Sequence, residues 1–145
     1  MAATVDRIHH REGASVHPLH AFLLCGGVTL FLCTLLTDIT YARSYHIQWS
    51  NFSSWLLVGA LVLSGFALLF AVTGWLRSAD RRGRPMIYML LLLATWVLGF
   101  VNALQHARDA WGIMPGALVL SVLCALLGLA ALWAAYTSRR IGGVA

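Results

Sequence analysis

Four long apolar runs separated by short polar segments dominate the pattern of the chain. The runs cover residues 20–41, 54–76, 86–107 and 116–136. At a rise of about 1.5 Å per residue, a helix of about 20 residues reaches the roughly 30 Å thickness of a bilayer's hydrocarbon core. The pattern therefore predicts an all-α integral membrane four-helix bundle. It forms one domain, residues 19–138, between a polar arm (1–18) and a short tail (139–145).

The polar segments also carry signals for helix ends. Pro18 precedes the first run, where a helix tolerates proline in its first turn. The segment 42–53 contains eight polar or aromatic-polar side chains and predicts a loop, in which Ser50, Asn51 or Ser53 caps the second helix.

Arginine is distributed unevenly among these segments and predicts the orientation. All ten basic residues are arginine: two in the arm, four in the turn 77–85 and two in the tail, against one each in the loops 42–53 and 107–115. Cytoplasmic loops of membrane proteins carry the excess of positive charge. We therefore expect both termini in the cytoplasm and the two arginine-poor loops on the periplasmic side.

The composition narrows the class of protein. Apolar residues make up 60% of the 145 residues and charged residues only 10%, which leaves too little polar surface for a water-soluble globule. The net charge of +5 lies in the short flanks of the spans. We therefore expect the lipid bilayer, and not a nucleic acid, to be the partner of these charges. Three cysteines, all within apolar runs, argue against a disulfide framework.

Small residues recur at helical spacing on every span and predict the faces on which the helices meet, because small side chains let helix backbones approach in lipid. The stripes are Gly26, Thr29, Cys33 and Thr37; Ala60, Ser64, Ala67, Ala71 and Gly74; Thr95, Gly99 and Ala103; and Ala117, Ser121, Ala125 and Gly128. Trp96 stands apart from the other tryptophans because it lies in the middle of a span.

Candidate chemistry gathers at the predicted periplasmic end. The polar cluster there comprises Asp38, His46, Trp49, Asn51, Asn102, His106, Arg108, Asp109 and Trp111. On a helix, Asn102, His106 and Asp109 share one face. A carboxylate beside an imidazole suits a proton relay or a metal ligand. The alternative is structural: Asp38–Arg108 or Arg43–Asp109 ion pairs that fix the loops.

Histidines raise the question of a metal or haem. His17 and His20 share one face of a helical turn and are weak candidates for a metal site, with capping or interfacial anchoring the preferred interpretation. Axial ligation of haem b needs imidazoles at one depth. His17 and His20 lie a whole span away from His106, and His46 is on a loop, so these four are weak ligand candidates and no cofactor is expected.

Several runs resemble a known family. They are His17-Pro18-Leu19-His20-Ala21, residues 37–41, residues 47–52 and residues 102–111, within a resemblance that covers 17 to about 136. The family is a bacterial four-helix membrane family catalogued as a domain of unknown function (number two-two-three-one). The resemblance implies the fold and the membrane location. In the first span the family's common His-Phe-Pro is replaced by Leu-Cys-Gly. Some relatives accompany periplasmic redox proteins, which is an association only.

These observations lead to three hypotheses, none with catalytic residues, because the chain has no Ser/His/Asp set, phosphate loop or GxGxxG motif. The first is a non-enzymatic inner-membrane subunit or anchor for a periplasmic, possibly redox, partner. The second is a membrane electron carrier that binds haem b or a metal, which an absorption spectrum with metal analysis would test. The third is a small proton-coupled transporter that uses Asp38 and His106, disfavoured because neither lies near the midplane, where transporter sites usually sit. The sequence carries no signal for an oligomeric state.

Overall fold

The computed structural model describes residues 17–78 and 82–137 of the chain. It contains four long helices, α2 (Pro18–Ser44), α3 (Ile47–Arg77), α4 (Arg84–His106) and α5 (Gly116–Thr137), and one 3₁₀ turn, η1 (Ala110–Gly112). Each long helix is long and apolar enough to cross a membrane, as predicted. Residues 1–16 of the predicted arm, the predicted tail and Arg81 lie outside the described residues.

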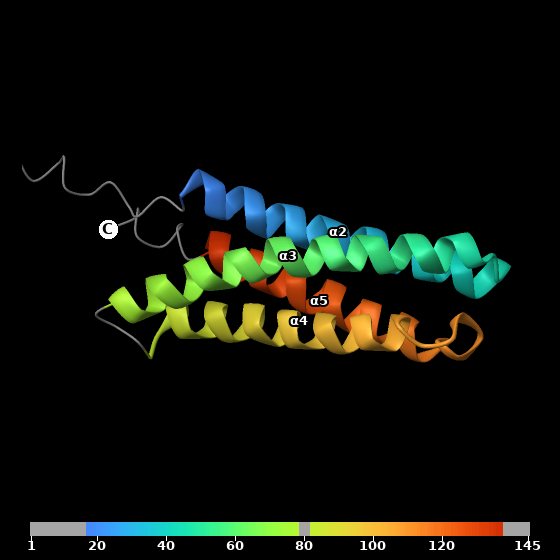
Figure 1. Cartoon of the computed structure of the whole chain (residues 1–145). Helices are drawn as coiled ribbons and strands as arrows, with labels where there is room; N and C mark the ends of the chain where they lie inside the picture. The colour runs from blue at the N-terminus through green and yellow to red at the C-terminus, as the bar shows by residue number, and fades with distance from the viewer. Residues whose placement is uncertain (1–16, 79–81, 138–145) are drawn as a thin grey trace, which may run out of the picture.

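The four helices run antiparallel, each beside the next in the chain (Figure 1). Contacts between α5 and α2 close the ring. One end of the bundle holds the α2–α3 connection and the segment 107–115 between α4 and α5. We call it the α2–α3 end. The opposite end holds the start of α2, the α3–α4 connection and the end of α5.

The predicted loop 42–53 is wrong, because most of it is helical. Helix α2 continues to Ser44 and α3 begins at Ile47. Between them, Tyr45 has the left-handed conformation (φ 52°) and its N–H donates to the carbonyl of Tyr41 at 2.8 Å, which ends α2. Hydropathy marks the part of a helix that lies in hydrocarbon. A helix that extends beyond the hydrocarbon carries polar side chains there without ending.

The predicted caps of the second span are consequently wrong as well. Ser50, Asn51 and Ser53 lie inside α3, whose N-cap is His46 and has no side-chain capping bond. At the start of α2 the expectation holds: Pro18 is in the first turn and the His17 ring nitrogen accepts a hydrogen bond from the Leu19 N–H at 3.3 Å. Capping, the preferred interpretation of His17, is confirmed.

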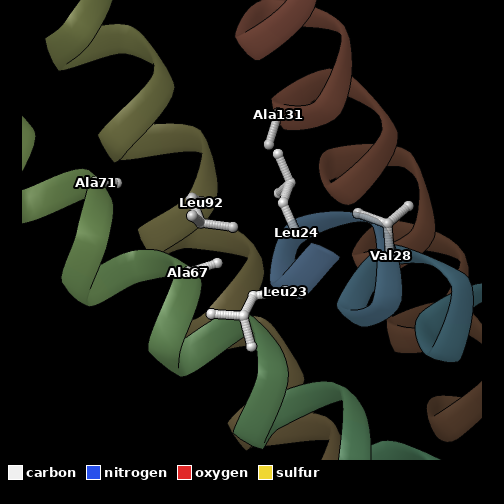
Figure 2. Packing of buried hydrophobic residues seen from close by; sticks show 7 residues of the cluster. All are labelled: Leu23, Leu24, Val28, Ala67, Ala71, Leu92 and Ala131. Carbon is white, nitrogen blue, oxygen red and sulfur yellow. The ribbon is translucent and has the colours of Figure 1, made fainter. Parts of the chain in front are cut away.

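The core of the bundle near the start of α2 is a cluster of aliphatic side chains from all four helices (Figure 2). Its buried members are Leu23, Leu24, Val28, Ala67, Ala71, Leu92 and Ala131. The outer surface carries large apolar side chains, among them Phe22, Trp55 and Trp133, each more than two thirds exposed. An apolar exterior is the surface that a lipid-facing helix requires.

The small-residue stripes are confirmed on α5 and largely on α3 and α4, and only in part on α2, where Gly26 lies against Leu63 and Thr37 hydrogen-bonds to Ser53 of α3. Those on α3 to α5 are buried except Gly74, which is exposed, and Ala103, which is half-buried. On α2 the buried face is instead Leu24, Gly27, Phe31, Thr34 and Asp38, with Thr29 exposed. Large side chains of α2 fill the space opposite small residues of its neighbours, as Phe31 does at Gly99. One stripe of small residues therefore does not require a second one facing it.

Trp96, the tryptophan in the middle of a span, joins α3 to α4. Its indole N–H donates to the carbonyl of Leu61 at 3.1 Å. The ring lies against Gly65, where an added Cβ would come within 3.1 Å of the indole nitrogen. An indole N–H in lipid needs an acceptor, and this contact supplies one.

Candidate functional site

Asp38 lies in the interior of the bundle near the α2–α3 end and is fully buried. One carboxyl oxygen, Oδ1, lies 3.0 Å from Nε2 of His106 on α4, and the other, Oδ2, accepts a hydrogen bond from the Ser121 hydroxyl on α5 at 2.5 Å. Among the described residues this is the one ion pair. Asp38 therefore joins three helices, and its partner is His106 rather than Arg108.

His106 is the last residue of α4 and has both ring nitrogens engaged. Nδ1 lies 3.0 Å from the backbone carbonyl of Asn102, one turn earlier. A carbonyl oxygen only accepts hydrogen bonds, so Nδ1 carries a hydrogen. Nε2 then faces the Asp38 oxygen as either an acceptor or a donor.

The Asp38–His106 pair must hold one proton between the two groups. If the carboxyl is ionised, the imidazole is doubly protonated and donates through Nε2; if the imidazole is neutral, the carboxyl carries the proton and donates to it. Both arrangements have the same total charge of zero. Without that proton, a carboxylate would face an imidazole lone pair at 3.0 Å in a buried site, which is unfavourable.

Asn102 and Ser121 close the arrangement into a ring. The Asn102 amide donates to the Ser121 hydroxyl at 2.8 Å, and that hydroxyl donates to Asp38. Asn102 is fully buried, and its Oδ1 has no hydrogen-bond partner among the described residues. We call Asp38, Asn102, His106 and Ser121 the four-residue network. Buried polar groups in lipid are costly and are often functional.

A pocket of about 340 Å³ reaches the network from the α2–α3 end. It lies between the first two turns of α3 and the end of α4. Its walls are formed by Ile47, Gln48, Ser50, Asn51, Ser54, His106, Arg108 and Ala110. His106 thus belongs both to the pocket wall and to the network, although its side chain is only 1% exposed.

The remaining residues of the predicted cluster lie on the surface of the same end. His46 and Asp109 are exposed, and the Asp109 carboxylate accepts from the Trp111 N–H at 3.4 Å, which caps η1. Trp111 is 73% exposed and its ring stacks on Tyr45, with centroids 6.3 Å apart. Trp49 is 37% exposed. Neither proposed loop ion pair forms among the described residues.

Three hydrogen-bonded contacts at this end were not predicted from the sequence. Ser121 was assigned only to helix packing, although it donates to Asp38. The Tyr41 hydroxyl donates to the carbonyl of Ala110 at 2.8 Å and holds the α4–α5 segment over the end of α2. Thr37 and Ser53 share a hydrogen bond of 2.7 Å between α2 and α3. Each polar residue sits at a core-facing helix position, which is the signal that would have identified it.

His17 and His20 lie at the other end of the bundle, as the sequence predicts. Nε2 of His20 is 2.8 Å from the hydroxyl of Tyr88 at the start of α4. In the described part of the chain, no three His, Cys, Asp or Glu side chains are grouped as metal ligands. Because both nitrogens of His106 are engaged, this arrangement offers no free lone pair for an iron. Haem b therefore stays a hypothesis for an absorption spectrum to test.

The comparisons with known proteins bear on the fold. The family described as "Predicted membrane protein (DUF2231)" matches residues 16–138. The comparison with curated proteins and the comparison with solved structures each found no match.

Proposed function

The chain belongs to the DUF2231 family of predicted membrane proteins, and we propose that it is a bacterial inner-membrane protein whose α2–α3 end binds a polar ligand together with a proton. The observation that carries the proposal is the pocket whose inner wall is His106, the residue that shares a proton with buried Asp38. A ligand in the pocket would lie beside His106, whose ring is sealed from solvent with only 1% of the side chain exposed. The charge of the ligand would then affect whether the pair keeps its proton.

The arginine distribution supports a periplasmic position for this pocket. The three sequence segments 1–18, 77–85 and 139–145 carry eight arginines, and the two segments at the α2–α3 end carry Arg43 and Arg108. The excess of positive charge belongs on the cytoplasmic side. The pocket would thus open toward the periplasm.

The titratable and charged groups at this end come from α2, the start of α3 and the end of α4 with the segment after it. They are Asp38, Tyr41 and Arg43 on α2, Tyr45 and His46 between α2 and α3, His106 at the end of α4, and Arg108 and Asp109 after it. Of these side chains, only those of Asp38 and His106 hydrogen-bond each other. By reciprocal linkage, an anion beside His106 favours the protonated pair, and the protonated pair favours the anion.

The proposal is proton-linked binding at one side of the membrane. Transport across it would need a polar path between the pair and the opposite end. Much of the interior there is the aliphatic cluster of Leu23, Leu24, Val28 and Leu92 with its alanines, and the buried hydroxyls of Thr34, Ser64 and Thr95 donate to carbonyls of their own helices. Such an interior favours the hypothesis of proton-linked binding or sensing over the hypothesis of a proton-coupled transporter.

Infrared titration of the purified full chain tests whether the Asp38–His106 pair holds one proton. We expect wild-type protein to show a carboxyl band that changes with pH, because the pair holds one proton between the Asp38 carboxyl and the His106 imidazole. The carboxyl band is the readout because imidazole side chains, six in this chain, also exchange protons near neutral pH. Asp38→Asn should abolish this carboxyl signal, and Asp109→Asn, which removes an exposed carboxylate at the same end, should leave it unchanged. An identical carboxyl signal in wild type and Asp38→Asn would contradict the proposal.

A second candidate function is a membrane subunit that docks a periplasmic redox protein. The stacked pair of Tyr45 and Trp111, 53% and 73% exposed, favours it, because exposed aromatic side chains are typical of binding hot spots. His106 is buried and unsuited to docking.

Co-purification of a periplasmic cytochrome or dehydrogenase tests this second candidate. We expect Trp111→Ala to reduce recovery of the partner about tenfold or more, as for a hot spot above 1.4 kcal/mol. The matched control is Trp133→Ala, which removes an equally exposed tryptophan near the opposite end. Unchanged recovery with Trp111→Ala would rule out this docking surface.

A further inference from the structure

The charge of the pocket walls is positive. Arg108 is the one formally charged residue among the lining residues, and none of them is Asp or Glu. Its Nη1 donates to Oε1 of Gln105 at 3.3 Å, and the rest of the guanidinium fork has further N–H donors. Asp109, the adjacent acid, does not line the pocket and is engaged with the N–H of Trp111. The walls therefore suit an anion.

The first turn of α3 adds backbone donors to the same pocket. Ile47 and Gln48 begin this helix of 31 residues, and both line the pocket. The first N–H groups of a helix lack intrahelical partners and carry a partial positive charge. No side chain caps this helix, which leaves the N–H groups of Ile47 and Gln48 without a capping side chain, while the Trp49 N–H donates to the carbonyl of His46. Helix N-termini of this kind bind carboxylate and phosphate oxygens.

Ser50 supplies an independent indication of a ligand. The residue is only 5% exposed, lines the pocket, and makes no side-chain hydrogen bond among the described residues. Neighbouring Ser54 donates to the Ser50 carbonyl at 3.0 Å and Ser53 pairs with Thr37, so the hydroxyls around it are satisfied. Buried hydroxyl groups are normally hydrogen-bonded. The Ser50 hydroxyl is not among the unpartnered atoms that are shut off from solvent, so it is accessible as a donor from the pocket that Ser50 lines.

We infer that this pocket binds a small oxyanion, a carboxylate or a phosphate or sulfate-type group, between the first turn of α3, Ser50 and Arg108. The volume of about 340 Å³ is at the lower end of small-ligand pockets and fits a small ligand. The inference rests on the proposed function for the role of His106 as the inner wall. It adds the chemical class of the ligand.

Thermal unfolding of the full chain in detergent tests the inference with sulfate and acetate as probes, at constant ionic strength against chloride. We expect a saturable rise of Tm with at least one of them. Arg108→Gln and Ser50→Ala should weaken the apparent affinity, Arg108→Gln by about tenfold or more because it removes a charge-assisted hydrogen bond. Arg43→Gln, which removes the other arginine at this end, should behave as wild type. The inference is overturned if neither probe nor lipid gives a saturable response, or if Arg108→Gln and wild type respond equally.

The oxyanion has two possible sources, and nanodiscs distinguish them. If a lipid headgroup fills the pocket, anionic phosphatidylglycerol nanodiscs should raise the Tm of wild type but not of Arg108→Gln, and should abolish the response to sulfate. If a free ligand fills it, sulfate should act equally in phosphatidylglycerol and phosphatidylcholine nanodiscs. Both results support the oxyanion site and assign its occupant.

The pH dependence separates this inference from the proposed function. Sulfate keeps its charge over the relevant range, so any change of its affinity reports on the protein. We expect wild-type affinity to fall as the pH rises and the Asp38–His106 pair loses its proton, and Asp38→Asn to show no such fall. If the wild-type affinity for sulfate depends on Arg108 but does not change with pH, the proton linkage is overturned and the oxyanion site stands. If the pair releases its proton but no oxyanion changes the Tm, the oxyanion site is overturned and the proton on the pair stands.

Discussion

Replacing His106 with alanine is expected to destabilise the folded protein by about 3 kcal/mol, the lower end of the cost of removing one partner from a buried ion pair. The substitution leaves Asp38 fully buried, with only the Ser121 hydroxyl as a partner. An ordinary hydrogen bond between membrane helices contributes only about 0.6 kcal/mol on average. The size of the loss therefore reports whether the pair behaves as a buried charge.

The same variant should show a pH dependence of stability. At low pH the Asp38 carboxyl of His106→Ala can take a proton and become neutral, which lowers the cost of its burial. The loss relative to wild type should therefore be smaller at low pH and larger at high pH. Reversible unfolding in mixed micelles at several pH values measures it. Ser121→Ala, which removes one donor to the same carboxyl, is the control and should cost about 1 kcal/mol. A loss below that of Ser121→Ala would contradict the shared-proton description.

Replacing Gly27 with leucine is expected to prevent α2 and α3 from packing. A Cβ at Gly27 would lie 3.1 Å from the backbone nitrogen of Ser64, 3.3 Å from its Cβ and 3.4 Å from its Cα. Backbone atoms cannot rotate away as a flexible side chain can. Overpacking of a dense core costs about 1–3 kcal/mol or more, and here a whole leucine side chain must enter the helix contact. We expect a loss of at least about 3 kcal/mol, the upper part of that range.

Gly74→Leu supplies the matched control for this prediction. Gly74 lies in α3 and a Cβ there would meet nothing within 4 Å. The same chemical change should therefore alter the free energy of unfolding by less than about 1 kcal/mol, the scale of the difference between glycine and other residues in helix propensity. Similar losses in the two variants would show that leucine acts through helix propensity or lipid contact rather than through the α2–α3 contact.

Much of the candidate site is present in the sequence as separate residues. Asp38 and His106 are conspicuous because they are ionisable and lie at the ends of apolar runs. Their pairing is not readable there, because Asp38 has Arg43, Arg108 and His106 as alternative partners at the same end. Ser121 is a polar residue within a small-residue stripe, but the sequence does not show which partner it meets, and Ser50 falls in the predicted loop. Its place inside α3 is what directs it to the pocket.

The sequence by itself determined the four apolar spans and the gathering of polar residues at one end. Hydropathy and charge are local properties of each segment, and in lipid an apolar segment of this length must satisfy its backbone as a helix. Only the tertiary structure decided that Asp38 meets His106, 68 residues away, and Ser121, 83 residues away. Those meetings depend on the rotation of each helix about its own axis. Packing between helices sets that rotation, as where Phe31 of α2 lies against Gly99 of α4. The face predicted for α2 from small residues alone did not include Phe31.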